Sequence, residues 1–229
     1  MLTTLTSIKE QLQANSGAYR FLYTPESSIT NKYWFVGLNP GGSSFDESSL
    51  SVEKNNAFIN EKWGKYNHKT NTISFNQLQQ QVHHFFQSMS TNLNIQDWEK
   101  EMSQNWMISN YVFYKSKNWA QMSSKKEHIE TSRKIWKELI STNQPKIIVA
   151  NGFDTYEKMS NLMLEDNWTK ESEKVSFNPW DGPHISVLKK DSKKCLIIGF
   201  AHLSTFKIMK REKNKISMNN IYELIKRYY

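Results

Sequence analysis

Residues 32–45 read KYWFVGLNPGGSSF, and they predict the first strand of the fold and the turn that follows it. Its apolar run, residues 33–36, is aromatic and β-branched and ends at a glycine, which is typical of a buried strand. The turn that follows contains Asn39 and the pair Gly41-Gly42, whose lack of side chains lets the backbone approach a ligand closely. Ligands of open α/β sheets bind at the carboxyl ends of strands, so Asn39 stands where a functional group is expected. The alternative is an Asn-Pro turn with a purely geometric role.

Apolar runs and helical periodicities predict the rest of the domain. Buried strands are expected at residues 106–114, 146–150 and 195–200, and the alternating segment 184–188 adds another. Helices are expected at residues 5–12, 75–89, 127–140, 153–164 and 216–229, with Ser74 as the N-cap of the second. This alternation predicts one α/β domain over residues 1–229, with a central, mostly parallel four-stranded sheet flanked by helices. The polar segments 48–71 and 166–183 are expected to be long loops, either lining a site or forming neutral surface.

The charge and the cysteine content restrict the partners of the chain. A net charge of +8 and a pI of about 9.3 favour a polyanionic partner, most often nucleic acid, although lysine-rich surfaces also serve solubility. The single cysteine, Cys195, lies in an apolar run and is expected to be a buried small hydrophobe. One cysteine excludes an intrachain disulfide framework and any four-cysteine metal or iron–sulfur site.

Targeting signals are not expected in this chain. Residues 1–13 are amphipathic rather than signal-like, and no run approaches the roughly 20 apolar residues of a membrane span. We therefore expect a cytoplasmic or nucleoid-associated protein with no membrane contact. We also expect a monomer that needs no metal and no cofactor.

Three predicted strands end in polar side chains of different chemical kinds. The first delivers Asn39, the second carries Asn110, and the last long strand delivers His202. One amide can orient water, the other can read the edge of a heterocycle, and an imidazole can stabilise a departing anion. A lone histidine at a strand end is often structural, so the prediction depends on all three residues together.

Two of these residues lie in motifs that resemble those of the uracil-DNA glycosylase superfamily. The segment 37–41, GLNPG, is similar to the first active-site motif, closest to the GMNPG and GINPG forms of the single-strand-selective monofunctional and mismatch-specific branches. The segment 202–205, HLST, resembles the second motif, usually written HPSP. The resemblance covers only these motifs, the Asn110 strand and the strand order, and it implies a central parallel sheet flanked by helices.

The resemblance also implies an activity and roles for single residues. The protein would be a monofunctional DNA glycosylase that flips out a pyrimidine and hydrolyses its glycosidic bond, without a metal. Asn39 would position the attacking water, His202 would stabilise the leaving base, and Asn110 would read the base edge. Phe45 would stack on the base beside Gly41 and Gly42. The residues expected at the DNA are Leu203, Ser204, Phe206, Lys207, Lys210 and Arg211, with Leu203 and Phe206 as wedges and the three cations on phosphates.

This sequence departs from the family pattern at two positions. Leu203 replaces the proline of the second motif, which puts the shape of the His202 loop in doubt. Gly42 stands where uracil-specific branches often place a bulkier residue, and Gly41-Gly42 builds no wall against substituents at C5 of the pyrimidine. We therefore expect a pocket that accepts 5-modified, even bulky, pyrimidines, for a role in repair or in defence against phage DNA.

Other functions compete with this one. A phosphate-cradling nucleotide site is disfavoured because no lysine follows the glycines as in a P-loop. A metal nuclease is disfavoured because no carboxylates cluster at the predicted strand ends. A non-catalytic binder of modified or single-stranded DNA, using Phe45, Trp119 and the basic segment 207–215, stays open.

Overall fold

The computed structural model describes residues 5–41, 48–53, 55–117, 119–171, 175–176, 182–211 and 214–229. Within these residues a seven-stranded sheet forms the centre, in the order β4-β1-β5-β9-β8-β6, with β7 also paired to β8. Its strands are β1 (Tyr33–Gly37), β4 (Trp106–Asn110), β5 (Ile147–Asn151), β6 (Thr169–Lys170), β7 (Val175–Ser176), β8 (His184–Lys190) and β9 (Lys193–Phe200).

Four strands of this sheet are parallel and correspond to the four main apolar runs of the sequence. β1 pairs with β4 on one side and β5 on the other, and β5 pairs with β9, all in parallel. The expected four-stranded sheet is nevertheless too small, because β8, β6 and β7 extend it in antiparallel fashion. The β8–β9 hairpin supplies this extension, and β6 and β7 come from the segment 166–183 that the sequence analysis expected to be loop.

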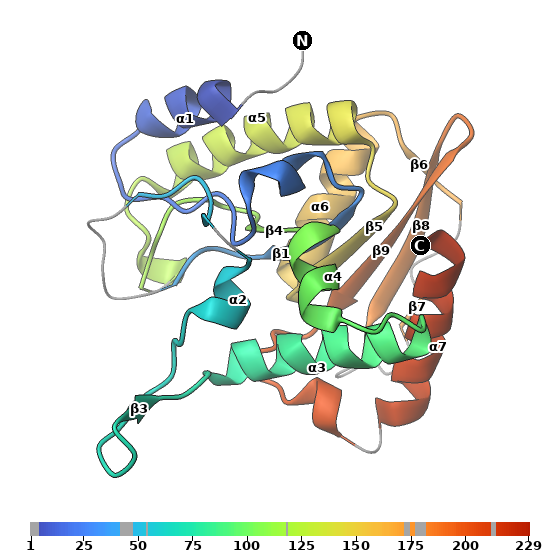
Figure 1. Ribbon diagram of the computed structural model, residues 1–229. Helices are drawn as coiled ribbons and strands as arrows, with labels where there is room; N and C mark the ends of the chain where they lie inside the picture. The colour runs from blue at the N-terminus through green and yellow to red at the C-terminus, as the bar shows by residue number, and fades with distance from the viewer. Residues whose placement is uncertain are drawn as a thin grey trace.

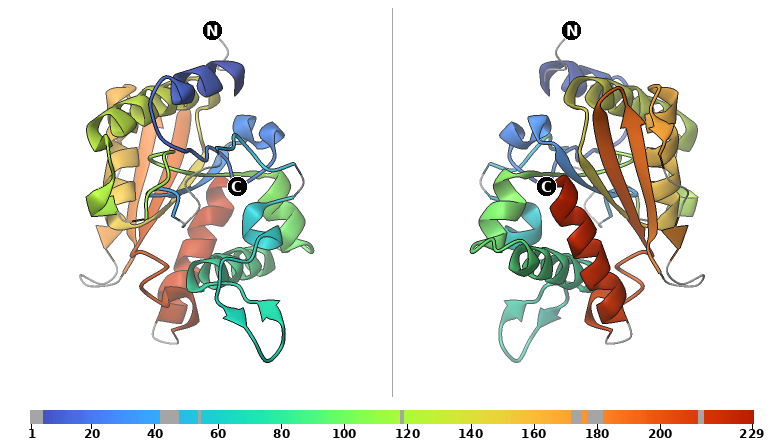
Figure 2. Two further views of the ribbon diagram at one scale, coloured as in Figure 1. Left: turned by 90° about the vertical axis from the view of Figure 1, so that its left-hand side faces the viewer. Right: turned by 90° about the vertical axis from the view of Figure 1, so that its right-hand side faces the viewer.

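Helices cover both faces of the sheet (Figures 1 and 2). One face carries α1 (Leu5–Gln13), α5 (Lys125–Asn143) and α6 (Phe153–Glu165), and the other carries α2 (Ala57–Asn60), α3 (Gln77–Asn92), α4 (Trp98–Gln104) and α7 (Lys215–Tyr228). Successive residues of β1 alternate between the two cores: Trp34 packs with the first group of helices and Phe35 with the second. This three-layer α/β arrangement confirms the predicted class. Short 3₁₀ turns lie at η1 (Glu26–Thr30), η2 (Trp119–Gln121) and η3 (Ile208–Lys210).

Several local expectations are corrected by the structure. The N-cap of α3 is Asn76, not Ser74, because Asn76 and Gln79 form a reciprocal capping box. The strand expected at 106–114 ends at Asn110, beyond which the chain bonds to the loop after β1. A small antiparallel hairpin, β2 (Tyr66–Asn67) and β3 (Thr72–Ile73), occupies part of the expected loop 48–71.

The sulfur of Cys195 lies in the first core, where the residue is fully buried, as predicted. Burial raises the pKa of its thiol far above the ordinary value.

The order of the parallel strands places one strand end at a special position. β1 lies between β4 and β5, and the chain leaves β1 over one face of the sheet but leaves β4 and β5 over the other. The carboxyl end of β1 is therefore a topological switch point, where open α/β sheets form their ligand crevices.

Candidate active site

A cavity of about 510 Å³ opens at this switch point. Its lining comes from the ends of β1 and β4, from the segment before β1, and from α2 and the residues that flank the β2–β3 hairpin: Arg20, Tyr23, Phe35, Gly37, Asn39, Pro40, Gly41, Phe58, Glu61, Trp63, Asn76, Leu78, Ser109, Asn110, Lys115 and Asn151. The volume falls within the range of small-molecule sites. Asn39 and Gly41, predicted from one strand end, thus meet Asn110, predicted from another, in one cavity.

The Asn110 carboxamide is held in a fixed orientation at the end of β4. Its Nδ2 donates to the Tyr23 hydroxyl at 3.0 Å, and the residue is only 7% exposed. Its Oδ1 lies over Gly37, where a Cβ would come within 2.2 Å of that oxygen. Because Gly37 at the end of β1 has no side chain, it leaves room for the Asn110 amide.

Asn39 is anchored by the loop that extends β1. Its Nδ2 donates to the carbonyl of Pro40 at 3.1 Å and approaches that of Ser116 at 3.5 Å. The Ser116 amide in turn donates to the Pro40 carbonyl at 3.0 Å, so the two loops are tied together. With the amide nitrogen directed at backbone carbonyls, Oδ1 is the Asn39 atom suited to accept a hydrogen bond from water.

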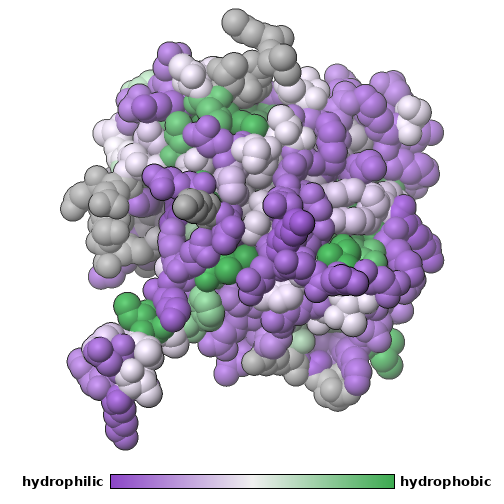
Figure 3. All heavy atoms as spheres, viewed as in Figure 1, coloured by the Kyte–Doolittle hydropathy of each residue, from purple (hydrophilic) through white to green (hydrophobic). Residues whose placement is uncertain are grey.

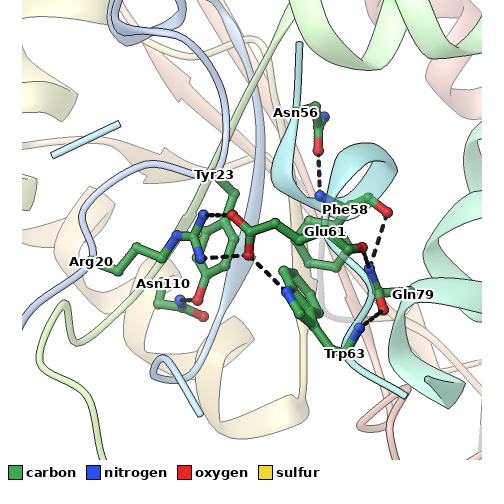
Figure 4. A network of polar contacts seen from close by, with 8 residues as sticks. All are labelled: Arg20, Tyr23, Asn56, Phe58, Glu61, Trp63, Gln79 and Asn110. Atoms are coloured by element: carbon green, nitrogen blue, oxygen red, sulfur yellow. Dashed lines mark hydrogen bonds and ion pairs between the residues drawn. The ribbon is translucent and has the colours of Figure 1, made fainter. Parts of the chain in front are cut away.

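An ion pair forms one wall of the cavity (Figure 4). The Arg20 guanidinium donates to the Glu61 carboxylate through both terminal nitrogens, one of them at 2.9 Å, and it lies 4.5 Å from the centre of the Tyr23 ring. Trp63 Nε1 donates to the same carboxylate at 2.8 Å. Burial raises the carboxyl pKa, but hydrogen bonds from Arg20 and Trp63 outweigh it and lower the pKa of Glu61. The Arg20–Glu61 wall therefore contains two charged groups but carries no net charge.

Aromatic side chains form the rest of the wall. The Phe58 ring stands edge-on to Trp63 at 4.8 Å between centres and tilted to Tyr23 at 5.5 Å. Burial raises the pKa of the Tyr23 hydroxyl, against the charge of Arg20 and the hydrogen bond from Asn110, so the phenol stays protonated. Sequence reasoning missed Phe58, Trp63 and the Arg20–Glu61 pair, because nothing in the local pattern shows that residues 41 positions apart meet.

His202 lies at the same edge of the sheet but outside the lining of this cavity. It follows β9, one strand beyond β5, and it flanks Asn151, which does line the cavity and accepts from the Leu203 amide at 2.8 Å. The Ser204 hydroxyl and His202 Nδ1 are 2.7 Å apart. Burial lowers the pKa of His202, which favours the neutral imidazole.

The residues expected to contact DNA differ in their solvent exposure. Ser204 and Lys207 are exposed and Phe206 is 40% exposed, whereas Arg211 is half-buried. Leu203 is fully buried in the second core, so its assignment as a surface wedge is wrong: the apolar side chain is used for packing. Lys210 lies in η3. Gly42 and Phe45 lie outside the described residues.

Two further features of the described residues bear on possible partners. They hold no group of three or more histidine, cysteine or acidic side chains arranged to bind a metal ion. Nor does any helix within these ranges combine the length and the apolarity needed to cross a membrane.

The comparisons with known proteins give no further assignment. No protein-family model matches the chain, and no curated protein sequence matches it at a significant level.

Proposed function

We propose that the protein is a monofunctional DNA glycosylase that hydrolyses the N-glycosidic bond of an extruded pyrimidine. The observation that carries this proposal is the convergence of Asn39 and Asn110, at the ends of neighbouring parallel strands, on one aromatic-lined cavity. A base inside a duplex is out of reach, so such an enzyme needs a pocket that grips the base by its edge and its face. An amide edge and an aromatic wall meet that need.

Base recognition falls to Asn110 and its neighbours. The hydrogen bond to Tyr23 fixes the carboxamide before any ligand arrives, and the amide offers a donor and an acceptor to the pyrimidine edge. Phe58 takes the stacking role that the sequence analysis gave to Phe45, because its ring lines the cavity beside Asn110. The neutral Arg20–Glu61 wall suits an uncharged base.

The chemical step uses Asn39 in the cavity and His202, which lies beyond the end of β9 at the same edge of the sheet and outside the cavity lining. Asn39 orients a water molecule through Oδ1; the oxygen of this water bonds to C1′ as the bond from C1′ to the base nitrogen breaks. The base departs with the bonding electron pair and gains a proton, and the water loses one. A neutral His202 donates a hydrogen bond to the developing anion, as the lowered pKa permits.

The cavity supports a substrate larger than plain uracil. A Cβ built on Gly41 meets no described atom within 4 Å, so this side of the pocket is open among the described residues. The φ of Gly41 does not lie in the left-handed region, so the backbone conformation there does not require a glycine. We therefore include 5-modified pyrimidines in the substrate class, with repair and defence against modified phage DNA as the corresponding roles.

An abasic-site assay tests the proposal. Oligonucleotides that carry uracil, 5-hydroxymethylcytosine or a glucosylated cytosine are incubated with the protein and then treated with alkali, which cuts at abasic sites. We expect cuts that depend on Asn39, with Asn39→Ala losing about 10²–10³-fold in rate while DNA binding persists. Asn220→Ala, an exposed amide on α7, serves as the control. DNA binding without cuts in any substrate would instead favour the non-catalytic binder.

A further inference from the structure

The β2–β3 hairpin projects from the rim of the candidate active site. Its two flanking residues, Trp63 and Asn76, both line the cavity, whereas every residue from 65 to 74 is exposed. Figures 1 and 3 show the segment as an arm that extends away from the body of the molecule. If the cavity binds one unit of a large polymer, the neighbouring units of that polymer would therefore lie next to this arm.

One buried side chain fixes the base of the arm. Gln79, fully buried in α3, accepts through Oε1 from the backbone amides of Trp63, at 3.0 Å, and Asn76, at 3.2 Å. Its Nε2 donates to the carbonyls of Phe58, at 3.2 Å, and Glu61, at 2.6 Å. The base of the hairpin and the cavity wall are thus held by the same amide, which Figure 4 shows at their junction.

A second contact closes the stem above this clamp. Gly64 donates to the Ser74 carbonyl at 2.8 Å, and a Cβ on Gly64 would lie 2.3 Å from that oxygen. An isolated two-stranded hairpin is only marginally stable in water. These two clamps give the arm a defined direction without packing its outer half.

The arm exposes apolar and cationic side chains together. Tyr66 and Ile73 are a cross-strand pair, 47% and 43% exposed. Lys65 and Lys69 are exposed beside them, and the sequence contains no acidic residue between Glu61 and Asp97. Large exposed apolar residues on a basic element are typical of nucleic-acid contacts, where the apolar groups meet bases or sugars and the lysines meet phosphates.

We propose that the β2–β3 hairpin contacts DNA next to the extruded nucleotide, with Tyr66 and Ile73 against the opened base stack and Lys65 and Lys69 on the phosphates. The inference rests on the proposed function, which puts DNA at the cavity mouth. It also replaces the wedge that the sequence analysis assigned to Leu203, which is buried. Positive charge and position on the rim favour DNA over a protein partner for this surface.

DNA binding tests the inference without knowledge of the excised base. The probes are a fluorescent 21-mer duplex with one tetrahydrofuran abasic-site analogue, which the enzyme cannot cleave, and the same duplex without it. We expect Tyr66→Ser/Ile73→Ser to weaken binding to the abasic duplex about tenfold or more, by loss of stacking. We expect Lys65→Gln/Lys69→Gln to lower the slope of log affinity against log salt by about 0.9 for each lost phosphate contact.

The control variants make the same kinds of substitution at exposed positions outside the hairpin. Leu164→Ser replaces an exposed apolar side chain at the end of α6, and Lys189→Gln/Lys226→Gln removes two exposed lysines, one on β8 and one in the last turn of α7. Both should leave affinity and salt slope within about twofold of the wild-type values, because screening limits distant charges. The melting temperatures of the hairpin variants should equal that of the wild type, since the substituted side chains are exposed.

The outcomes separate the two proposals. Hairpin variants that bind DNA like the wild type overturn the inference, even if the protein excises bases, and a hairpin that serves a protein partner would give this result. Weakened binding by the hairpin variants together with no excision by the wild type supports the inference and contradicts the glycosylase proposal. A wild-type protein that binds neither duplex overturns the inference.

Discussion

The carboxyl edge of the parallel strands neutralises its buried charge, whereas the opposite edge gathers positive charge. At the first edge Arg20 and Glu61 pair beside the amides of the cavity. At the other, Lys32, Lys146 and Lys193 stand side by side, just before or at the start of three adjacent strands. They line a hollow of about 680 Å³ together with Lys194 and Arg227.

The net charge of +8 is therefore not concentrated at the cavity. Burial and then repulsion from Lys193 and Lys146 lower the pKa of Lys32, whose ammonium group donates to the carbonyl of Asn143, the last residue of α5. Lysines near a helix carboxyl end complement its dipole and its free carbonyls, which accounts for this cluster structurally. We expect function to depend on the carboxyl edge, where the cavity lining adds Lys115 to the Arg20–Glu61 pair.

After the loss of Asn39, the largest effect on excision should come from a single methyl group added at the carboxyl edge. Gly37→Ala places a Cβ 2.2 Å from Asn110 Oδ1, so the amide must move. We expect excision to fall about 10–100-fold, as for the loss of one bidentate base contact. Steady-state kinetics on the best substrate measures this. Gly17→Ala, at a glycine with φ of +115° near α5, tests whether backbone disturbance alone gives the same loss; equal effects would contradict the role of Asn110.

Two ion pairs, one at the cavity and one between α5 and α6, should differ in their effect on stability. Glu61→Ala leaves Arg20, whose side chain is 16% exposed, without its carboxylate, and we expect the free energy of unfolding to fall by about 1–3 kcal/mol. Glu165→Ala removes the carboxylate that pairs with Arg133 between α5 and α6. Because the Arg133 side chain is 33% exposed, the free energy of unfolding should fall by less in this variant. Urea denaturation of both variants decides the order, and a larger effect at Glu165 would contradict the distinction.

Substrate choice should respond to Gly41. Gly41→Leu fills space that is open among the described residues, so it should fold normally and lower excision of a 5-substituted pyrimidine about tenfold or more relative to uracil. Competition between the two oligonucleotides in one reaction measures the ratio directly. An unchanged ratio would show that C5 substituents lie elsewhere in the cavity.

His202 should titrate at an unusually low pH. Because burial lowers its pKa in the folded state, protonation opposes folding, and stability is lost as the pH falls below about 6.5, the ordinary histidine value. The imidazole should stay neutral between pH 7 and 8, where the excision rate should be independent of its titration. NMR titration of the histidine ring protons, with His202→Gln for assignment, gives the pKa; a value at or above about 6.5 would contradict the prediction.

The smallest effect should come from substitutions at the opposite edge of the sheet, where Lys32, Lys146 and Lys193 lie. β1 has five residues, about 16 Å at roughly 3.3 Å each, so this edge lies more than a Debye length of about 8 Å from the cavity at physiological salt. Lys146→Gln/Lys193→Gln/Arg227→Gln should therefore change DNA affinity and excision less than about twofold. A marked loss of affinity in this triple variant would show that DNA also reaches the far edge.

Much of the scaffold was predictable because its strands are apolar runs. The segments 33–36, 146–150 and 195–200 correspond to β1, β5 and β9, and Asn39 and Asn110 were placed at strand ends that do meet. The antiparallel extension was underestimated because β6 and β7 are two-residue strands in polar sequence. Such strands carry too few residues for any periodicity to show.

The cavity wall was less predictable because it depends on distant partners. Phe58 and Trp63 look like ordinary apolar residues in sequence, and only the fold shows that they border a cavity as well as the second core. Leu203 shows the reverse case: a motif position expected at the surface is used for packing. Local patterns report which residues are apolar, not which apolar residues border open space.

The burial of Cys195 has a practical consequence for studying the hairpin. It is the single cysteine of the chain. Because burial keeps its thiol protonated, we expect it not to react with thiol-reactive dyes in the folded protein. A cysteine introduced at Thr70, in the exposed turn between β2 and β3, would then be the one labelled position. The natural sequence is thus already a background in which a single fluorophore can report movements of the arm while a substrate binds.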